Sequence, residues 1–180
     1  MSKLYIMMGA PGSGKSTFIE NHLNYDIHKW ISRDIIRFSM VSENEEYFSK
    51  EKEVFKEYIR RINECLNRGW DVFADATHLN KASRNKLIRS LNLQSVSSIE
   101  VIWIKTPFEE CIKRNKTREG TRAYVPESAI RNMYASIEVP EFEEGIDVIH
   151  IVEDGKPVRI IKRLEKMIKR MEELKNDVSN

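Results

Sequence analysis

The feature that most constrains this chain is the stretch from Gly9 to Ser16, which reads Gly-Ala-Pro-Gly-Ser-Gly-Lys-Ser and is followed by Thr17. It matches the phosphate-binding P-loop pattern of a glycine, four residues and then Gly-Lys-Ser. Residues 4–8 predict a short buried strand before the loop, and residues 15–23 predict the helix after it. A strand, this loop and a helix, in that order, are typical of a nucleotide-binding α/β fold.

The chemistry of the loop follows from its residue types. Its backbone N–H groups must point at a β-phosphate, and glycine tolerates the backbone angles and the close approach that this demands. The positive end of the following helix adds to the attraction, Lys15 can reach the β and γ oxygens, and Ser16 can offer its hydroxyl to Mg²⁺. The alternative is a glycine-rich turn that matches by chance. The predicted nucleotide-binding residues are Gly12, Ser13, Gly14, Lys15, Ser16 and Thr17.

Length and charge limit the other possibilities. The 180 residues fit one domain, residues 1–180, with a core of ordinary size. The 30 Lys and Arg residues nearly balance the 28 Asp and Glu residues, so any contact with nucleic acid must come from local clusters. Cys65 and Cys111 have no metal-ligand spacing and are expected to be free thiols. Without a long apolar run the protein is expected to be soluble and cytoplasmic.

Beyond the P-loop, strands are predicted to alternate with helices. The further strands are expected at residues 27–31, 70–74, 98–105 and 147–152. A long helix is expected to open at a capping box, Ser42 to Glu45, and to end before Gly69. Later helices are expected at residues 81–91, from 107, at 127–136 and at 158–174. This order predicts a parallel sheet of about five strands with helices on both faces and ligands at the carboxyl ends of the strands.

Residues that follow the expected strands are therefore candidates for the site. Asp34 is a candidate general base for an attacking hydroxyl, and Arg37, on the same face of a helical turn, could bind a phosphate on the acceptor. A helix N-cap with a surface ion pair would give the same pattern. Asp75 could hold the water shell of Mg²⁺ or the acceptor, or could simply end its strand in a turn. His78 lacks a second ligand nearby, so we expect no metal there.

A basic run from Lys113 to Arg122, closed by Pro126, forms a further candidate element. Its glycine and its charge predict a mobile lid over residues 113–126, with Arg118 on the γ-phosphate and Arg114 or Arg122 as substitutes. A solvated loop would have a similar sequence.

Five motifs together resemble a known family. They are G-A-P-G-S-G-K-S-T (9–17), S-R-D-I-I-R (32–37), D-A-T-H-L-N-K-A-S-R (75–84), K-R-N-K-T-R-E-G-T-R-A-Y-V-P (113–126) and R-N-M-Y (131–134). They resemble the P-loop kinase domain of 5′-hydroxyl polynucleotide kinases, especially the phage type, and the resemblance spans most of the chain. Many kinases share the P-loop, whereas the combination with R-D-x-x-R and K-R-N is much narrower.

The resemblance implies a role for each candidate. Lys15 and Ser16 would bind ATP and Mg²⁺, Asp34 would be the general base, and Arg37 would hold the 3′-phosphate of the terminal nucleotide. Asp75 would support the acceptor site, and Arg118 would be the lid arginine on the transferred phosphate.

Three features of the sequence differ from the family pattern. The D-x-D-G-T-type motif of the 3′-phosphatase domain that usually accompanies such kinases in nucleic acid repair is absent. Ser32 stands where the family has Asn, and the lid is longer by Glu119 and Tyr124. The last difference leaves the choice of the lid arginine open by a few positions.

The leading hypothesis is an ATP-dependent polynucleotide 5′-hydroxyl kinase acting on DNA or RNA, with separate phosphatase or ligase proteins as possible partners. The first alternative is a kinase of a small acceptor such as a nucleoside, a nucleotide, a sugar or a modified base. The second is a non-catalytic nucleotide-binding module. The preference for DNA or RNA, the donor preference, the oligomeric state and the pathway stay open at this stage.

Overall fold

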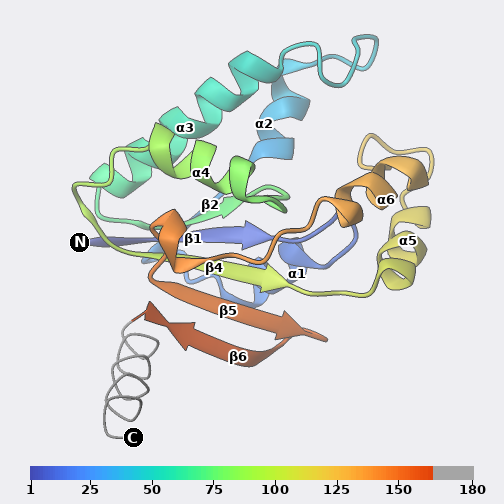
Figure 1. Cartoon of the computed structure of the whole chain (residues 1–180). Helices are drawn as coiled ribbons and strands as arrows, with labels where there is room; N and C mark the ends of the chain where they lie inside the picture. The colour runs from blue at the N-terminus through green and yellow to red at the C-terminus, as the bar shows by residue number, and fades with distance from the viewer. Residues whose placement is uncertain (164–180) are drawn as a thin grey trace, which may run out of the picture.

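The computed structural model describes residues 1–163 of the chain and shows a six-stranded sheet between helices (Figure 1). The strand order is β2-β3-β1-β4-β5-β6. Every neighbouring pair from β2 to β5 is parallel, and β6 is antiparallel to β5. The α/β prediction is confirmed, with one antiparallel strand more than expected. The strands are β1 (Ser2–Met8), β2 (His28–Ser32), β3 (Asp71–Asp75), β4 (Val96–Ile104), β5 (Val148–Glu153) and β6 (Lys156–Lys162).

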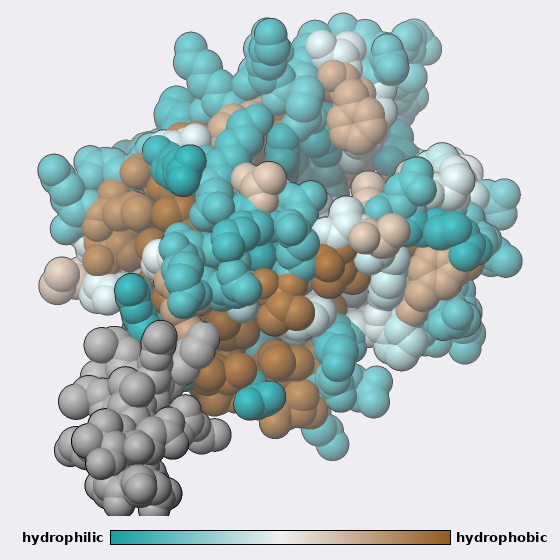
Figure 2. Space-filling model, in the orientation of Figure 1, coloured by the Kyte–Doolittle hydropathy of each residue, from teal (hydrophilic) through white to brown (hydrophobic). Residues whose placement is uncertain are grey.

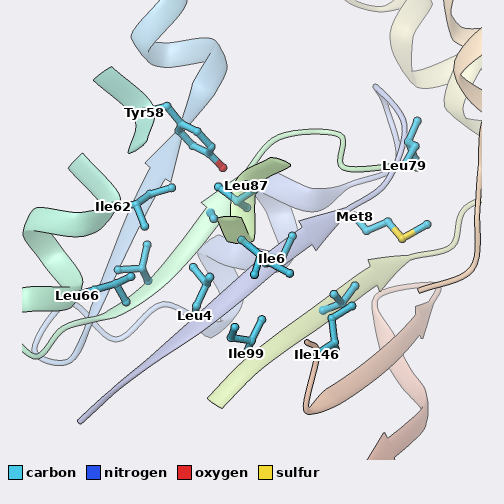
Figure 3. Packing of buried hydrophobic residues seen from close by; sticks show 14 of the residues in the cluster. Leu4, Ile6, Met8, Tyr58, Ile62, Leu66, Leu79, Leu87, Ile99 and Ile146 are labelled. Carbon is cyan, nitrogen blue, oxygen red and sulfur yellow. The ribbon is translucent and has the colours of Figure 1, made fainter. Parts of the chain in front are cut away.

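Helices cover the sheet on both faces. They are α1 (Lys15–His22), α2 (Arg33–Met40), α3 (Glu51–Asn67), α4 (Lys81–Ser90), α5 (Phe108–Lys116), α6 (Glu127–Ala135) and a short 3-10 helix, η1 (Phe142–Glu144). The larger core lies on the face of α3 and α4. There Tyr58, Ile62 and Leu66 of α3 pack toward Leu4 and Ile6 of β1 (Figure 3).

The smaller core lies on the other face of the sheet, because side chains alternate between the two faces along each strand. Phe18 and Ile19 of α1 pack there against Met7, Phe73 and Ile102. On the surface, hydrophilic residues predominate over α3, whereas hydrophobic residues gather over β4 and β5 (Figure 2).

The register of the central strands fixes the position of the site. In the pairing of β2, β3 and β1, Asp75 lies opposite Ser32 on one side and Met7 on the other. The carboxyl ends of the three strands are therefore level. The P-loop leaves β1, α2 leaves β2 and the 75–80 loop leaves β3 at the same edge of the sheet, as the sequence predicted.

One predicted helix is wrong in the part that the structure describes. Residues 158–162 were expected to begin a helix, but they belong to strand β6. Asp154 (φ 49°) and Gly155 (φ 74°) both adopt positive φ, the conformation that a tight Asp-Gly hairpin requires. This turn sends the chain back antiparallel to β5. The remainder of the predicted helix, residues 164–174, lies outside the described residues.

The start of the long helix also differs from the prediction. Glu45 accepts hydrogen bonds from the backbone N (2.8 Å) and the hydroxyl (3.1 Å) of Ser42, so the expected local contact exists. It closes a turn, however, and α3 begins only at Glu51. The intervening segment, residues 41–50, is a connection between α2 and α3, and it contributes to the site described next.

Candidate active site

The P-loop adopts a backbone that only glycine allows at two positions. Gly12 has φ 79° and Gly14 has φ 99°. A side chain on Gly12 would also collide with α5, because its Cβ would lie 2.5 Å from the carbonyl oxygen of Cys111. The loop is therefore packed tightly against the start of α5, and its curvature is fixed by the fold.

The polar groups of the loop fit a phosphate ligand. The Lys15 ammonium donates to the carbonyl oxygens of Gly9 (2.8 Å) and Ala10 (3.1 Å), so it bends back over the loop. Burial lowers the pKa of Lys15, while the carboxylates of Asp75 and Asp34 act in the opposite direction. The buried hydroxyl of Ser13 has no hydrogen-bond partner within residues 1–163.

The helix after the loop presents two exposed hydroxyl groups in its first turn. Ser16 and Thr17 are exposed in the first turn of α1, where the helix end attracts anions. Magnesium in nucleotide sites is usually held by one or two protein oxygens together with phosphates. The described residues contain no group of three or more His, Cys, Asp or Glu side chains placed to hold a metal by themselves. The exposed Ser16 hydroxyl is of the type that supplies one such protein oxygen.

Asp34 and Arg37 form an ion pair at the start of α2. Nη1 of Arg37 lies 2.5 Å from Oδ1 of Asp34, and the hydroxyl of Tyr47 donates to the same oxygen over 3.0 Å. Burial, with the Asp34 charge as the next cause, raises the pKa of Tyr47 to about 12, which keeps this donor neutral. The helix N-cap is Ser32, whose hydroxyl accepts from the backbone N of Ile35. Asp34 is therefore not the N-cap that the alternative interpretation required.

The Arg37 guanidinium is held on several sides. Arg37 is only 5% exposed, and its Nη2 donates to Oε2 of Glu51 over 2.8 Å. The other oxygen of Glu51 binds Nη2 of Arg33. In residues 1–163, the buried Nε atoms of Arg33 and Arg37 have no hydrogen-bond partner. Two guanidinium groups thus lie side by side on one carboxylate and retain unused donors.

These groups line a cavity of about 490 Å³, which we call the acceptor cavity. Its charged and hydroxyl groups come from α2, from Tyr47 and from the start of α3. Its apolar and aromatic surface comes from Phe48, from the end of the predicted lid and from α6. The lining residues are Pro11, Arg33, Asp34, Arg37, Tyr47, Phe48, Glu51, Ala76, Thr77, Tyr124, Val125, Pro126, Ala129 and Met133.

A different cavity of about 340 Å³, the donor cavity, opens on P-loop residues 12–14. Thr17, Arg114 and Arg118 also line it, together with the Asp154-Gly155 turn. Nη1 of Arg114 lies 3.4 Å from the carbonyl oxygen of Ser13. Two of the three candidate lid arginines are therefore placed beside the P-loop.

Arg122, the third candidate, is placed elsewhere. It donates to the carbonyl oxygens of Phe38 (3.3 Å) and Val41 (2.5 Å), at the carboxyl end of α2. Its guanidinium also lies 4.9 Å from the centroid of the Phe38 ring. In this arrangement Arg122 attaches the 117–126 segment to α2.

Asp75 does not line the acceptor cavity, whereas the next residues, Ala76 and Thr77, do. The residue is 8% exposed, and its carboxylate accepts a 3.0 Å hydrogen bond from Nε1 of Trp30. Burial raises the pKa of Asp75, and the Lys15 ammonium opposes that rise. The structure thus pairs Asp75 with Lys15 electrostatically.

His78 is a buried structural residue. Its Nε2 lies 3.3 Å from the hydroxyl of Tyr58, and burial lowers the pKa of the ring to about 3. The imidazole is therefore neutral and packs against Tyr58 of α3.

Among the charged and aromatic residues that line the acceptor cavity, the sequence analysis did not predict Arg33, Tyr47, Phe48, Glu51 and Tyr124 as site residues. Tyr47, Phe48 and Glu51 fall in a segment expected to be an ordinary helix, and Tyr124 was noted only as a lengthening of the lid. The sequence feature that could have indicated them is the adjacent aromatic pair Tyr47 and Phe48, which fits no apolar periodicity and lies just before the acidic start of α3.

The sequence matches one protein family and resembles two longer proteins. A family model described as an AAA domain matches residues 4–140. A putative bifunctional polynucleotide phosphatase/kinase from Acanthamoeba polyphaga mimivirus is 27% identical over 156 residues, which cover 83% of this chain and 33% of that protein. The transcription factor bHLH140 of Arabidopsis thaliana is 23% identical over 150 residues, covering 80% of this chain and 15% of that protein. The chain thus spans a third or less of the length of these relatives.

Solved structures extend the likeness. A chain of the Pnkp1/Rnl/Hen1 RNA repair complex superimposes with a TM-score of 0.67 and 26% identity, over 90% of this chain and 48% of that chain. A sugar kinase from Janibacter sp. HTCC2649 superimposes with a TM-score of 0.61 and 17% identity, over 95% and 92% of the two chains. The fold is that of P-loop kinases. None of the helices within residues 1–163 has the length and the apolar composition needed to cross a membrane.

Proposed function

Because this chain belongs to the AAA domain family and has the fold of P-loop kinases, we propose that it is an ATP-dependent kinase of polynucleotide 5′-hydroxyl ends. One observation carries the proposal. The Asp34 carboxylate and the Arg37 guanidinium lie together in a cavity that also contains Pro11 of the P-loop. A hydroxyl acceptor with a nearby phosphate matches this pair in chemistry, since one group accepts a proton and the other binds an anion.

The donor would be ATP in the donor cavity. The backbone N–H groups of residues 12–14 and the Lys15 ammonium would bind its β- and γ-phosphates. Mg²⁺, held by the hydroxyl of Ser16, would neutralise charge on the phosphates when bound. Arg118, with Arg114 beside it, would contact the transferred phosphoryl group as the predicted lid arginine.

In the proposed transfer, Asp34 would act as the proton acceptor and Arg37 would position the acceptor. The 5′-hydroxyl oxygen forms a bond to the γ-phosphorus, the bond from that phosphorus to the bridging oxygen of ADP breaks, and the hydroxyl proton passes to Asp34. Arg37 would bind the 3′-phosphate of the same nucleotide and so set the distance between the hydroxyl and Asp34. Asp75 would keep Lys15 charged and directed into the site.

The likeness to the RNA repair complex and to the mimivirus protein supports a polynucleotide acceptor. One name contains RNA and the other contains polynucleotide, and the sequence identities of 26% and 27% to this chain exceed the 17% of the sugar kinase. Separate ligase or phosphatase proteins are the proposed partners; the several proteins named in the RNA repair complex support such partners, whereas the mimivirus protein is named as bifunctional. The alternative is a small-molecule acceptor, and the experiment must distinguish it from a polynucleotide acceptor.

The test is the transfer of labelled γ-phosphate from ATP and Mg²⁺ to a single-stranded 5′-hydroxyl oligonucleotide, beside nucleoside 3′-phosphates and gluconate. We expect the oligonucleotide to be labelled most efficiently, and Asp34→Ala to lower kcat by about 100-fold or more, the usual contribution of a general base. Asp26→Ala removes an exposed carboxylate outside both cavities and should leave the rate within about twofold. Labelling of gluconate alone, or full activity of Asp34→Ala, would refute the proposal.

A further inference from the structure

Phe48 is an exposed aromatic residue inside the acceptor cavity. It is 59% exposed, which leaves a large apolar surface in water. The ring is nevertheless held in place. The Arg37 guanidinium lies 5.3 Å from its centroid, and the Tyr47 ring packs edge-on against it at 4.8 Å.

A second set of apolar groups lines the same cavity from a distant part of the chain. Tyr124, 36% exposed, comes from the end of the predicted lid, and Val125 and Pro126 follow it. The side chain of Asn115 holds this segment, because it donates to the carbonyl oxygen of Val125 (2.7 Å) and accepts from its backbone N (3.1 Å). This apolar segment is thus fixed to α5 and does not depend on contacts with Phe48.

The charged and the aromatic residues together restrict the chemistry of the ligand. The Asp34 and Arg37 side chains suit a hydroxyl and an anion, whereas the rings of Phe48 and Tyr124 offer aromatic faces to the same cavity. A free sugar has no planar aromatic face and would gain no base stacking from these rings. A nucleotide would instead match both sets of residues. Its phosphate and hydroxyl would meet Arg37 and Asp34, and its planar base would stack on the aromatic rings, which stack on bases of any sequence.

We propose that Phe48 and Tyr124 form a nucleobase subsite, so that the enzyme recognises the base attached to the sugar whose hydroxyl it phosphorylates. The inference rests on the proposed function and makes it narrower. Stacking is indifferent to base identity, so it selects nucleotides over sugars without selecting a sequence. It assigns to Phe48 the role of a stacking platform that Arg37 supports from below.

The experiment compares two 5′-hydroxyl oligonucleotides that differ only in the first residue. One carries an ordinary base there, and the other carries a tetrahydrofuran abasic unit with the same 3′-phosphodiester. For the unaltered protein, we expect kcat/KM to be roughly tenfold higher with the base present, in line with one aromatic–base stack. Phe48→Leu should reduce this ratio to about one, and Phe48→Trp should retain it.

A matched control separates stacking in the cavity from a general affinity for nucleic acid. Tyr25 is 75% exposed and lies outside the acceptor cavity, so Tyr25→Leu removes an exposed aromatic ring from elsewhere on the surface. That variant should keep the full ratio. Equal rates of the unaltered protein on both oligonucleotides would overturn the nucleobase subsite while leaving the polynucleotide kinase intact. Failure to label either oligonucleotide would instead refute the proposed function.

Discussion

Oε2 of Glu51 accepts a 2.8 Å hydrogen bond from Nη2 of Arg37, although the two residues belong to different helices. The remaining carboxylate oxygen of Glu51 binds Arg33, so one acidic side chain at the start of α3 orients two guanidinium groups. The carboxylate between them offsets the repulsion of the two positive charges. Glu51 is thus a positioning residue for the anion-binding side of the acceptor cavity.

The first prediction is that Glu51→Gln weakens acceptor binding. Neutralising the carboxylate releases the Arg37 guanidinium from one of its two acidic partners, and misplaced substrate-binding groups are costly to catalysis. We expect the KM for a 5′-hydroxyl oligonucleotide to rise roughly tenfold, while the KM for ATP stays unchanged because Glu51 does not line the donor cavity. Steady-state kinetics with each substrate varied in turn would measure both values.

A matched variant is available on the same helix turn. Glu53→Gln removes another acidic residue from the first turn of α3, but Glu53 is exposed and lies outside the acceptor cavity. It should leave both KM values within about twofold. An equal rise in the KM for ATP and for the acceptor in Glu51→Gln would indicate a general loss of structure and would contradict the positioning role.

The sequence predicted the parts of the site that follow strand ends. The P-loop, Asp34, Arg37 and Asp75 could be placed because the carboxyl ends of parallel strands meet at one edge of a sheet, and the register confirms that they do. Whether these residues perform the assigned chemistry stays a prediction. The same argument could not place residues from connections, whose path is set by tertiary packing.

The wrong or missing predictions have the same physical cause, namely tertiary contacts that a local sequence pattern does not show. The Ser42–Glu45 contact has the form of a helix start, but here it closes a turn, so Tyr47 and Phe48 enter the cavity from a connection. In the basic run, Arg118 and Arg122 are equivalent by charge, and only the carbonyl groups at the end of α2 distinguish them. At β6, the apolar pattern was compatible with a helix, and the Asp154-Gly155 hairpin decided the outcome.

The second prediction concerns Arg122 and the predicted lid. Its guanidinium donates to carbonyl groups of Phe38 and Val41 at the carboxyl end of α2, where such bonds satisfy acceptors that the helix leaves open. In Arg122→Gln the 117–126 segment should lose its attachment to α2. We expect its amides to exchange with solvent about fivefold faster, measured by hydrogen–deuterium exchange with mass spectrometry, consistent with a loss of about 1 kcal/mol.

Arg131→Gln serves as the comparison for that experiment. Arg131 forms an exposed ion pair with Glu127 within α6, so its removal takes away a charge close to the same segment without breaking a contact to α2. Exchange in residues 117–126 should remain as in the unaltered protein. Faster exchange in both variants would assign the effect to net charge and would remove Arg122 as the attachment point.

The third prediction concerns the fully buried ion pair of Arg84 and Glu144. Nε and Nη2 of Arg84 each donate over 2.8 Å to the Glu144 carboxylate, and Nη1 donates to the carbonyl oxygens of His78 and Glu138. Removing one partner of a buried pair leaves the other charge uncompensated, which typically costs about 3–5 kcal/mol. Glu144→Gln should therefore lower the free energy of unfolding in urea by roughly that amount.

A double-variant cycle decides whether the two charges depend on each other. In Arg84→Leu/Glu144→Leu no buried charge remains, so the double variant should be less destabilised than the sum of the two single variants by about 2 kcal/mol or more. It should still be less stable than the unaltered protein, because the carbonyl oxygens of His78 and Glu138 lose a donor. The exposed pair Arg131–Glu127 should show a coupling below about 1 kcal/mol in the same assay. Strict additivity at Arg84 and Glu144 would mean that packing, and not charge pairing, holds α4 to η1 beside the site.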